Sequence, residues 1–147
     1  MPLKMKVSQN CAAITKQFEA CRYEPYICPA GKLTIGYGHT GSDVVEGMRI
    51  DKEKADALLM ADLQFAQNVV NSMVDADLTQ NQFDALCDFV FNCGSGNFKT
   101  STLRRLVNEK KFDEASLEFA RWNKGGGKVL PGLVARRAAE TALFVKV

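Results

Sequence analysis

Residues 18–40 read FEACRYEPYICPAGKLTIGYGHT. This stretch places a carboxylate, Glu19, near the end of a predicted helix, a thiol, Cys28, in a turn, and a hydroxyl, Thr34, on a predicted strand. Proline and glycine residues bend the chain between these side chains, so a single cleft can hold all three. Such a cleft could support acid–base catalysis, for example of the kind that glycosidases use.

The pattern on either side of this stretch predicts a helix and a strand. Over residues 8–20, Ser8 is a suitable N-cap and apolar side chains recur with helical spacing. Over residues 32–38 the side chains alternate, with three bulky residues on one side and Thr34 and two glycines on the other. Residues 41–50 are rich in turn formers and are expected to complete a small antiparallel sheet.

The rest of the chain is predicted to be helical. Asp51 caps a long helix over 51–74 with a broad apolar face, as expected of a helix that joins two lobes. Thr79 and Gln82 form a capping box for the next helix, which Gly94 ends. Further helices are expected at about 100–109, 113–122 and 132–146.

These elements indicate one mainly α, α+β domain with a cleft between two lobes. The expected divisions are an N-terminal lobe over about 8–50, a connecting helix over about 51–74 and a C-terminal helical lobe over about 75–147. The length of 147 residues fits a single domain, and 46% hydrophobic with 24% charged residues is a globular composition.

Composition also bounds the partners. No stretch approaches the roughly 20 apolar residues that span a membrane, and the first residues do not resemble a signal peptide. The segment from Lys99 to Val147 carries eleven basic and five acidic side chains. This balance suits an anionic polymer, either nucleic acid or a bacterial wall, although a solvated helical surface is the simpler explanation.

The cysteines and the histidine argue against a metal site. Five cysteines are an odd number, no two have CxxC spacing, and there is one histidine. We therefore expect neither a metal nor a cofactor, and mostly reduced cysteines.

At FEACRYEPYICPAGKLTIGYGHTG the sequence resembles the phage-type lysozymes, the muramidase endolysins of tailed bacteriophages. Four later segments match the same family in order and at similar spacing, namely FVFNCGSGNF, TSTLRRLVN, FARW and GGGKVLPGLVARRAAE. The resemblance therefore covers nearly the whole chain from about Ser8. It implies a lysozyme-like fold with a small N-terminal sheet, a long connecting helix and a helical C-terminal lobe.

The resemblance also implies roles for particular residues. The family's catalytic glutamate falls on Glu19 and its catalytic threonine on Thr34. Its second catalytic position, an aspartate in many members and a cysteine in others, falls on Cys28. Arg22 and Tyr26 match family positions between the first two, and we expect Tyr26 to bind substrate and Arg22 to be structural. Asn92 falls at a polar cleft position of the helical lobe and is a second expected substrate-binding residue.

We interpret Glu19 as the general acid that protonates the leaving oxygen of a glycosidic bond. Cys28 leaves open how the second role is filled, because a thiol with a reference pKa of about 8.5 is mostly neutral at pH 7. We therefore hypothesise that Cys28 and Thr34 position the water. Glu24 is expected to be an exposed carboxylate outside the site.

Several alternatives concern single residues. Cys28 with His39 could form a cysteine amidase or peptidase site, but a structural His39 paired with a carboxylate is favoured. Oxidation of Cys28, or a disulfide with Cys21 or Cys11, would remove the thiol from the cleft.

Three side chains of the C-terminal part have both a structural and a binding interpretation. Trp122 could stack on sugars, but its spacing from Phe119 favours the core. Arg136 and Arg137 can reach acidic groups of a glycan, or one can pair with Glu140 about one helical turn away. We expect one of the two arginines to be structural and one exposed, with Arg136 assigned to substrate binding.

The leading functional hypothesis is a peptidoglycan hydrolase that cleaves the β-1,4 bond between N-acetylmuramic acid and N-acetylglucosamine during host lysis. A lytic transglycosylase that uses Glu19 alone and a non-catalytic wall-binding protein are the alternatives. Dispersed basic residues disfavour nucleic acid. The family further implies a monomer without stable membrane association. Such a protein stays in the host cytoplasm until a holin opens the membrane, and then acts on the periplasmic wall.

Overall fold

The computed structural model describes residues 3–147. The chain begins with helix α1, a three-stranded sheet and the long helix α2: α1 (Gln9–Phe18), β1 (Arg22–Ile27), β2 (Leu33–Gly36), β3 (His39–Thr40) and α2 (Lys52–Met73). The remainder is helical apart from a short hairpin: α3 (Gln80–Cys93), α4 (Ser95–Lys99), α5 (Thr102–Asn108), α6 (Phe112–Ser116), the 3₁₀ helix η1 (Phe119–Arg121), β4 (Lys124–Gly125), β5 (Lys128–Val129) and α7 (Pro131–Val145).

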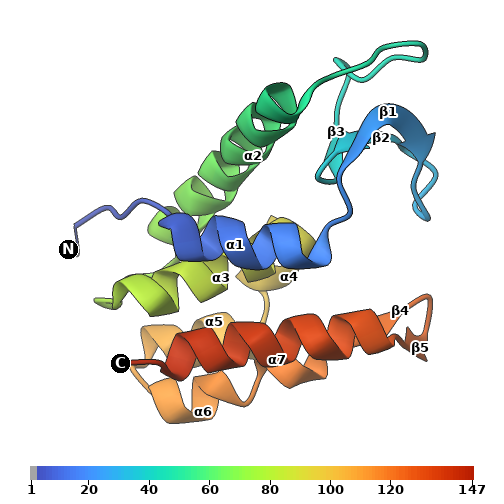
Figure 1. Cartoon of the computed structure of the whole chain (residues 1–147). Helices are drawn as coiled ribbons and strands as arrows, with labels where there is room; N and C mark the ends of the chain where they lie inside the picture. The colour runs from blue at the N-terminus through green and yellow to red at the C-terminus, as the bar shows by residue number, and fades with distance from the viewer. Residues whose placement is uncertain (1–2) are drawn as a thin grey trace.

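The small sheet stands apart from helices α3 to α7, and both termini lie at the end of the molecule away from it (Figure 1). Helix α1 packs against α3 and α7, so it belongs with the helical part although the sheet follows it directly in sequence. The observed architecture is the predicted mainly α, α+β arrangement with two lobes.

Helix α1 starts and stops where local chemistry predicts. The Ser8 side chain accepts a hydrogen bond from the backbone N–H of Asn10, which satisfies one of the free amides of the first turn. Glu19 is the C-cap, with extended backbone at φ −101° and ψ 120°. The helix therefore ends at Glu19 and the chain turns into the sheet from there.

The sheet differs from the prediction in its strands. Its order is β1-β2-β3, all antiparallel, with Tyr26 opposite Thr34 and Ile35 opposite His39. Residues 41–50 were expected to complete it, but they form turns, and His39–Thr40 supplies the third strand. Strand β1 was missed because it contains Pro25. Proline is tolerated there because β1 is an edge strand with a register irregularity between Arg22 and Tyr26.

Helix α2 joins the two parts by contributing to two separate hydrophobic clusters. The smaller cluster lies under the sheet and includes Ile35 with Ala55 and Leu58 from the start of α2. The larger cluster surrounds α3 and includes Leu63 and other residues further along α2. The prediction for 51–74 is confirmed, including Asp51, whose side chain accepts from the Lys54 backbone N–H at 2.8 Å.

Helix α3 is the buried centre of the helical part. It has the predicted capping box: Thr79 Oγ1 accepts from the Gln82 N–H at 3.1 Å, and Gln82 Oε1 accepts from the Thr79 N–H at 2.9 Å. Gly94 ends it at φ +94°, a conformation that favours glycine. Two acidic residues of α3, Asp84 and Asp88, are fully buried, which the apolar pattern did not predict.

The remaining helices agree with the prediction in part. The helices expected at 100–109 and 132–146 correspond to α5 and α7. The helix expected at 113–122 is instead the short helix α6 followed by the 3₁₀ helix η1. Helix α4 was not predicted, because its five residues resemble the continuation of a glycine-containing loop. Trp122 packs edge-to-face on Phe89 with ring centroids 5.5 Å apart, as expected of a core residue.

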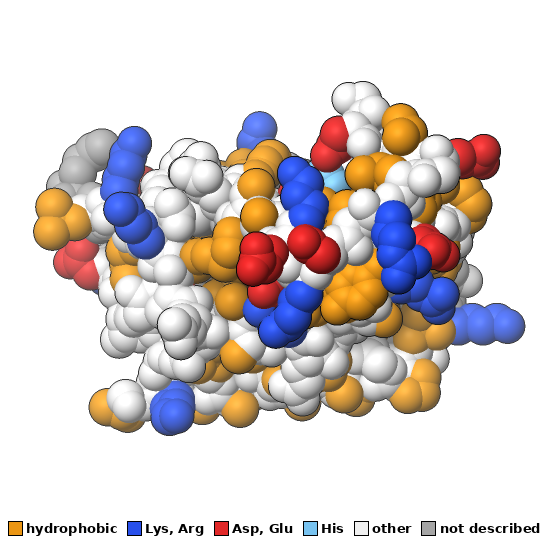
Figure 2. Space-filling view, turned by 45° about the horizontal axis from the view of Figure 1, so that its top comes forward, with side chains coloured by type: hydrophobic (Ala, Val, Ile, Leu, Met, Phe, Trp, Pro, Cys, Tyr) orange, Lys and Arg blue, Asp and Glu red, His pale blue; other side chains and the backbone are white. Residues whose placement is uncertain are grey.

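Charged side chains of both signs are interspersed on the face drawn in Figure 2, without one continuous basic patch there. Between residues 3 and 147, no helix combines the length and the apolar character that crossing a membrane requires.

Candidate active site

The carboxylate of Glu19 lies where α1 meets the sheet, and its side chain is 22% exposed. Oε2 accepts a hydrogen bond from Arg136 Nη1 at 2.6 Å. Oε1 lies against Gly38, where a Cβ atom would come within 2.8 Å of it. Gly38 also has φ +78°, so both its backbone and the carboxylate beside it favour a residue without a side chain.

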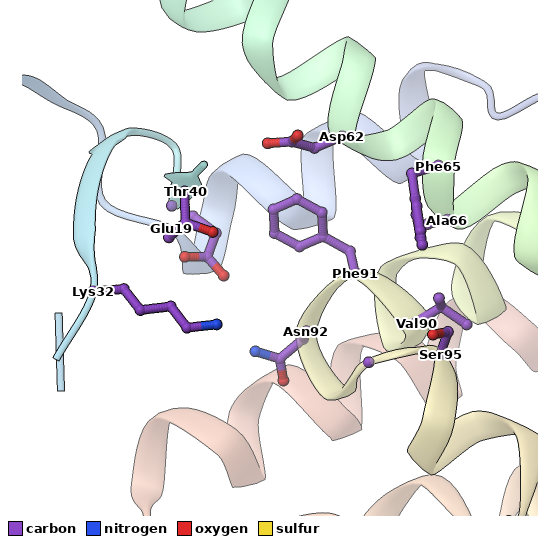
Figure 3. A pocket seen from close by; sticks show the side chains of 12 residues that line it. Glu19, Lys32, Thr40, Asp62, Phe65, Ala66, Val90, Phe91, Asn92 and Ser95 are labelled. Atoms are coloured by element: carbon purple, nitrogen blue, oxygen red, sulfur yellow. The ribbon is translucent and has the colours of Figure 1, made fainter. Parts of the chain in front are cut away.

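A cleft of about 730 Å³ opens beside Glu19. Four parts of the fold line it: the end of α1, the sheet with its turn, α2, and the end of α3 with the turn into α4. The lining residues are Glu19, Lys32, Gly38, Thr40, Asp62, Phe65, Ala66, Val90, Phe91, Asn92, Gly94 and Ser95. Figure 3 shows Glu19 and Lys32 on one side and Asn92 on the other, with the Lys32 side chain extending toward Asn92. This volume and mixed lining are typical of a ligand site.

Arg136 joins Glu19 to the buried Asp88. Its Nε and Nη2 donate to the two oxygens of Asp88 at 3.0 and 2.7 Å, while Nη1 donates to Glu19. Asp88 also accepts from the Thr15 hydroxyl at 2.7 Å. One planar guanidinium therefore fixes the position of the Glu19 carboxylate relative to the core of the helical part.

The placement of the two arginines corrects the sequence analysis. One was expected to be exposed, with Arg136 available to substrate, but Arg136 is 3% and Arg137 1% exposed. Arg137 makes the predicted contact with Glu140, at 2.9 Å, and also donates to Asn92 Oδ1 at 2.8 Å. Both side chains are buried because acidic and polar groups of α3 face them from positions more than 40 residues away in sequence.

The pKa values of two buried carboxyl groups in this network, Asp88 and Glu140, are shifted in opposite directions. Burial, followed by the neighbouring Asp88, raises the pKa of Glu140 well above its usual value. Burial would also raise the pKa of Asp88, but hydrogen bonds from Glu140 and Arg136 outweigh it and lower that pKa. The charged form is therefore favoured at Asp88, opposite Arg136, while the neutral form of Glu140 is more favoured than in an exposed glutamate.

Cys28 and Thr34 lie together on the sheet, but neither is among the residues that line the cleft. Thr34 is buried and its hydroxyl donates to the Lys32 carbonyl oxygen at 2.9 Å. A hydrogen bond from the same hydroxyl lowers the pKa of the partly exposed Cys28 thiol. A hydroxyl has one proton, so Thr34 serves either the carbonyl or the thiolate at a given moment.

Tyr26 connects these groups to Glu19. It lies opposite Thr34 in the sheet, and burial and the nearby Glu19 carboxylate raise the pKa of its phenol. The Arg22 guanidinium lies 4.9 Å from the centroid of the Tyr26 ring. Tyr26 is thus within electrostatic reach of Glu19 and Cys28, the two groups expected to share the chemistry.

His39 has the carboxylate partner that the sequence suggested. Nδ1 lies 2.8 Å from Asp62 on α2, and Nε2 lies 3.0 Å from Asp43 in the following turn. Burial acts to lower the pKa of His39, but the hydrogen bonds to Asp62 and Asp43 outweigh it and the pKa is raised. Because both ring nitrogens are occupied, the alternative of a Cys28–His39 amidase site loses support.

Two other sequence interpretations concern Glu24 and the cysteines. Glu24 is exposed, as expected, and pairs with Arg49 at 2.7 Å. All five cysteines are free in the described part of the chain. Cys11 is fully buried in the larger cluster, so the hypothesised disulfide with Cys28 would require that cluster to open.

Sequence reasoning missed the cleft residues of α2 and of the sheet turns. Asp62 and Phe65 carry no motif, and Lys32 and Thr40 were not singled out although they lie within residues 18–40. Phe65 lies on α2, for which a broad apolar face was predicted, yet it is 56% exposed. The one signal in the sequence for this part of the cleft was an aromatic residue, Phe65, at the edge of the apolar face of α2.

Comparisons with known proteins assign this chain to a family. Residues 16–140 match the family described as phage lysozyme, and the chain belongs to that family. The lysozyme-like fold that the resemblance implied is therefore confirmed.

Individual relatives agree with this assignment. The endolysin of Salmonella phage P22 is 40% identical over 145 residues, which cover 96% of this chain and 99% of that protein. The endolysin of Bacillus phage B103 is 46% identical over 143 residues, but the chain spans 54% of its length. The muramidase domain of SpmX from Asticaccaulis excentricus superposes with a TM-score of 0.90 at 41% identity, covering 97% of this chain and 99% of that domain.

The Asp88–Arg136 contact predicts a large effect of Asp88→Asn on stability. The substitution keeps the size of the side chain but removes one of the two charged partners of the buried guanidinium, so the free energy of unfolding should fall by about 3 kcal/mol. Urea unfolding at pH 7 measures this, with Asp77→Asn on the surface as the matched control. Equal stability of the two variants would contradict the assigned role of Asp88.

The raised pKa of His39 predicts a pH-dependent contribution to stability. The contribution should be fully present below the unfolded-state pKa of about 6.5 and should disappear as the pH rises through the higher folded-state pKa. Urea unfolding of wild type and His39→Gln from pH 5 to pH 9 tests this. The difference between them should be largest at pH 5 and shrink toward pH 9; a difference that grows with pH would refute it.

Proposed function

We propose that this chain is a peptidoglycan hydrolase that cleaves the β-1,4 bond between N-acetylmuramic acid and N-acetylglucosamine. The observation that carries the proposal is the placement of Glu19 at the edge of the cleft, held by Arg136 on one oxygen and packed against Gly38 on the other. Membership of the phage lysozyme family and the endolysin and muramidase relatives support it.

In this mechanism Glu19 is the general acid. Arg136 donates to Oε2, which leaves Oε1 as the atom that carries a proton to the leaving oxygen of the glycosidic bond. The rigid Asp88–Arg136 contact keeps the carboxyl group in one orientation while the substrate binds.

Cys28 and Thr34 act on the water that attacks the sugar. The lowered pKa of Cys28 raises the fraction of thiolate near neutral pH, and the thiolate is the form that can take up the proton that the attacking water releases. Thr34 fixes that thiolate and the water by hydrogen bonding. We assign contact with the sugar ring to Tyr26, because the charges of both Glu19 and Cys28 act on its phenol.

The opposite wall of the cleft supplies substrate contacts. Asn92 Oδ1 is occupied by Arg137, so its amide N–H₂ group remains for a sugar or acetamido oxygen. The Lys32 ammonium extends across the cleft and can pair with a carboxylate of muramic acid or of its peptide (Figure 3).

One observation favours a second candidate, the lytic transglycosylase. Cys28 and Thr34 do not line the cleft with Glu19, and a transglycosylase needs no water-activating group because the sugar's own hydroxyl closes an anhydro ring. The two activities leave different ends on the released muropeptides.

We further infer a monomer that acts on the bacterial wall, without a nucleic-acid partner or stable membrane association. Its release from the host cytoplasm would depend on a phage-encoded holin. Family membership supports these inferences, together with the interspersed charges on the face in Figure 2.

The decisive test is mass spectrometry of muropeptides released from purified peptidoglycan by wild type and by Glu19→Gln. We expect reducing muramic acid ends from the wild type and a loss of at least about 100-fold in the variant, since general acid catalysis contributes that much or more. Anhydro ends would favour the transglycosylase. Binding to the wall without any release would favour a non-catalytic protein.

A second prediction separates the roles of Cys28 and Thr34. If the thiolate is the base, Cys28→Ser should lower kcat by about 100-fold, and Cys28→Asp should restore activity with the rising limb of the pH–rate profile shifted to lower pH. Turbidity assays on permeabilised Gram-negative cells measure both. Full activity of Cys28→Ser together with loss in Thr34→Ala would show that Thr34 alone positions the water.

A further inference from the structure

We propose that the outer surface of α2 carries an additional saccharide-binding groove, in which Phe65 stacks on a sugar ring and leads the glycan strand out of the cleft. The proposal deepens the proposed function and rests on it for the identity of the polymer. It assigns the groove to uncharged sugars distant from the cleaved bond.

The groove is shallow and open to solvent, has a volume of about 630 Å³ and is formed by side chains of α2 alone. Its lining residues recur at helical spacing along one face: Ala61, Gln64, Phe65, Asn68, Val69 and Ser72. The eleven steps from the first to the last of them correspond to about 16 Å of helix, which exceeds the length of one sugar ring.

Phe65 joins this groove to the candidate active site. It is the one residue that lines both the groove and the cleft beside Glu19. Figure 3 places it on α2 at the edge of the cleft, near Asp62 and Ala66. A glycan strand that lies in the cleft therefore meets the Phe65 ring where it leaves.

The exposure of Phe65 is unusual within this chain. Five phenylalanines are at most 2% exposed, three are partly buried, and Phe65 is 56% exposed. Exposing an aromatic ring forgoes the stabilisation that burial gives, and here the exposed ring lies beside a cleft. The negative face of an aromatic ring attracts the positively polarised C–H bonds that cover one face of a pyranose.

The polar groups of the groove match a neutral polymer. Gln64 and Asn68 offer amides and Ser72 offers a hydroxyl, which pair with sugar hydroxyl and acetamido groups. None of the six lining side chains is charged. The peptide stems of peptidoglycan carry carboxylates and amines, so the groove fits the saccharide backbone better than the peptides.

The cleft itself has a different character. Glu19, Lys32 and Asp62 give it charges of both signs. We therefore assign the reacting sugars and their acidic substituents to the cleft, and the next sugars of the strand to Phe65 and the groove.

The test uses the full chain with Glu19→Gln, so that bound strands are not cleaved. Calorimetry measures the dissociation constant for long peptide-free glycan strands and for a disaccharide that the cleft alone can hold. Adding Phe65→Leu, which keeps an apolar side chain but removes the ring, should weaken binding of the long strands by about tenfold and leave the disaccharide unchanged. Phe65→Trp should bind the long strands as tightly or more tightly.

Two controls separate stacking from a structural effect. Met60→Ala changes an exposed apolar residue of the same helix outside the groove and should leave both constants unchanged. Replacing Gln64 and Asn68 together by Ala keeps the ring but removes the amides, and should again weaken only the long strands.

Three results would overturn the groove. The first is that Phe65→Leu weakens the binding of long strands and of the disaccharide equally. The second is that Phe65→Leu and Phe65→Trp change the binding of long strands equally. The third is that Phe65→Leu changes the binding of neither ligand. Failure of the proposed function is distinguishable, because it would appear as an absence of muropeptide release by wild type. Length-dependent weakening by Phe65→Leu would still support the groove in that case.

Discussion

The contact of the Arg136 guanidinium with two carboxylates is the interaction on which the candidate active site depends. Glu19 lies on α1, Asp88 on α3 and Arg136 on α7, so three helices meet at one planar cation. Burying such a cation without partners would be very unfavourable, and the structure compensates by placing a carboxylate at Nε and Nη2 and a second one at Nη1. Burial and the neighbouring Asp88 raise the pKa of Glu140 and so favour its neutral form, which limits the negative charge in the same space. The orientation of Glu19 is therefore a consequence of how the helical part packs.

The second constraint is that both parts of the fold pack their hydrophobic clusters against the same helix, α2. Its first turns belong to the cluster under the sheet and its later turns to the cluster around α3. His39 adds a polar connection, because its ring links Asp62 of α2 to Asp43 of the turn that follows the sheet. The cleft lies beside this helix, and its α2 wall carries the only exposed phenylalanine of residues 3–147. The same helix thus supports the sheet and forms one wall of the cleft.

Local signals explain which parts of the fold could be predicted from the sequence. The helices at residues 8–20, 51–74 and from Thr79 were predictable because caps and apolar spacing act within a few residues. Strand β1 was not, since Pro25 is acceptable there only because β1 is an edge strand. The family motif pointed to Glu19, which lines the cleft, and to Cys28 and Thr34, which do not. The burial of Arg136 was not predictable, because its partners lie 48 and 117 residues away and no local pattern records them.

The attachment of α1 has a consequence for motion. Glu19 is tied to the helical part twice, through the packing of α1 on α3 and α7 and through Arg136. Cys28 and Thr34 belong to the sheet. A hinge movement between the two parts would change both the separation of the acid from the thiol and the contact of Glu19 Oε1 with Gly38. Opening between the two parts would admit a long polymer, and closing would bring the reacting groups together.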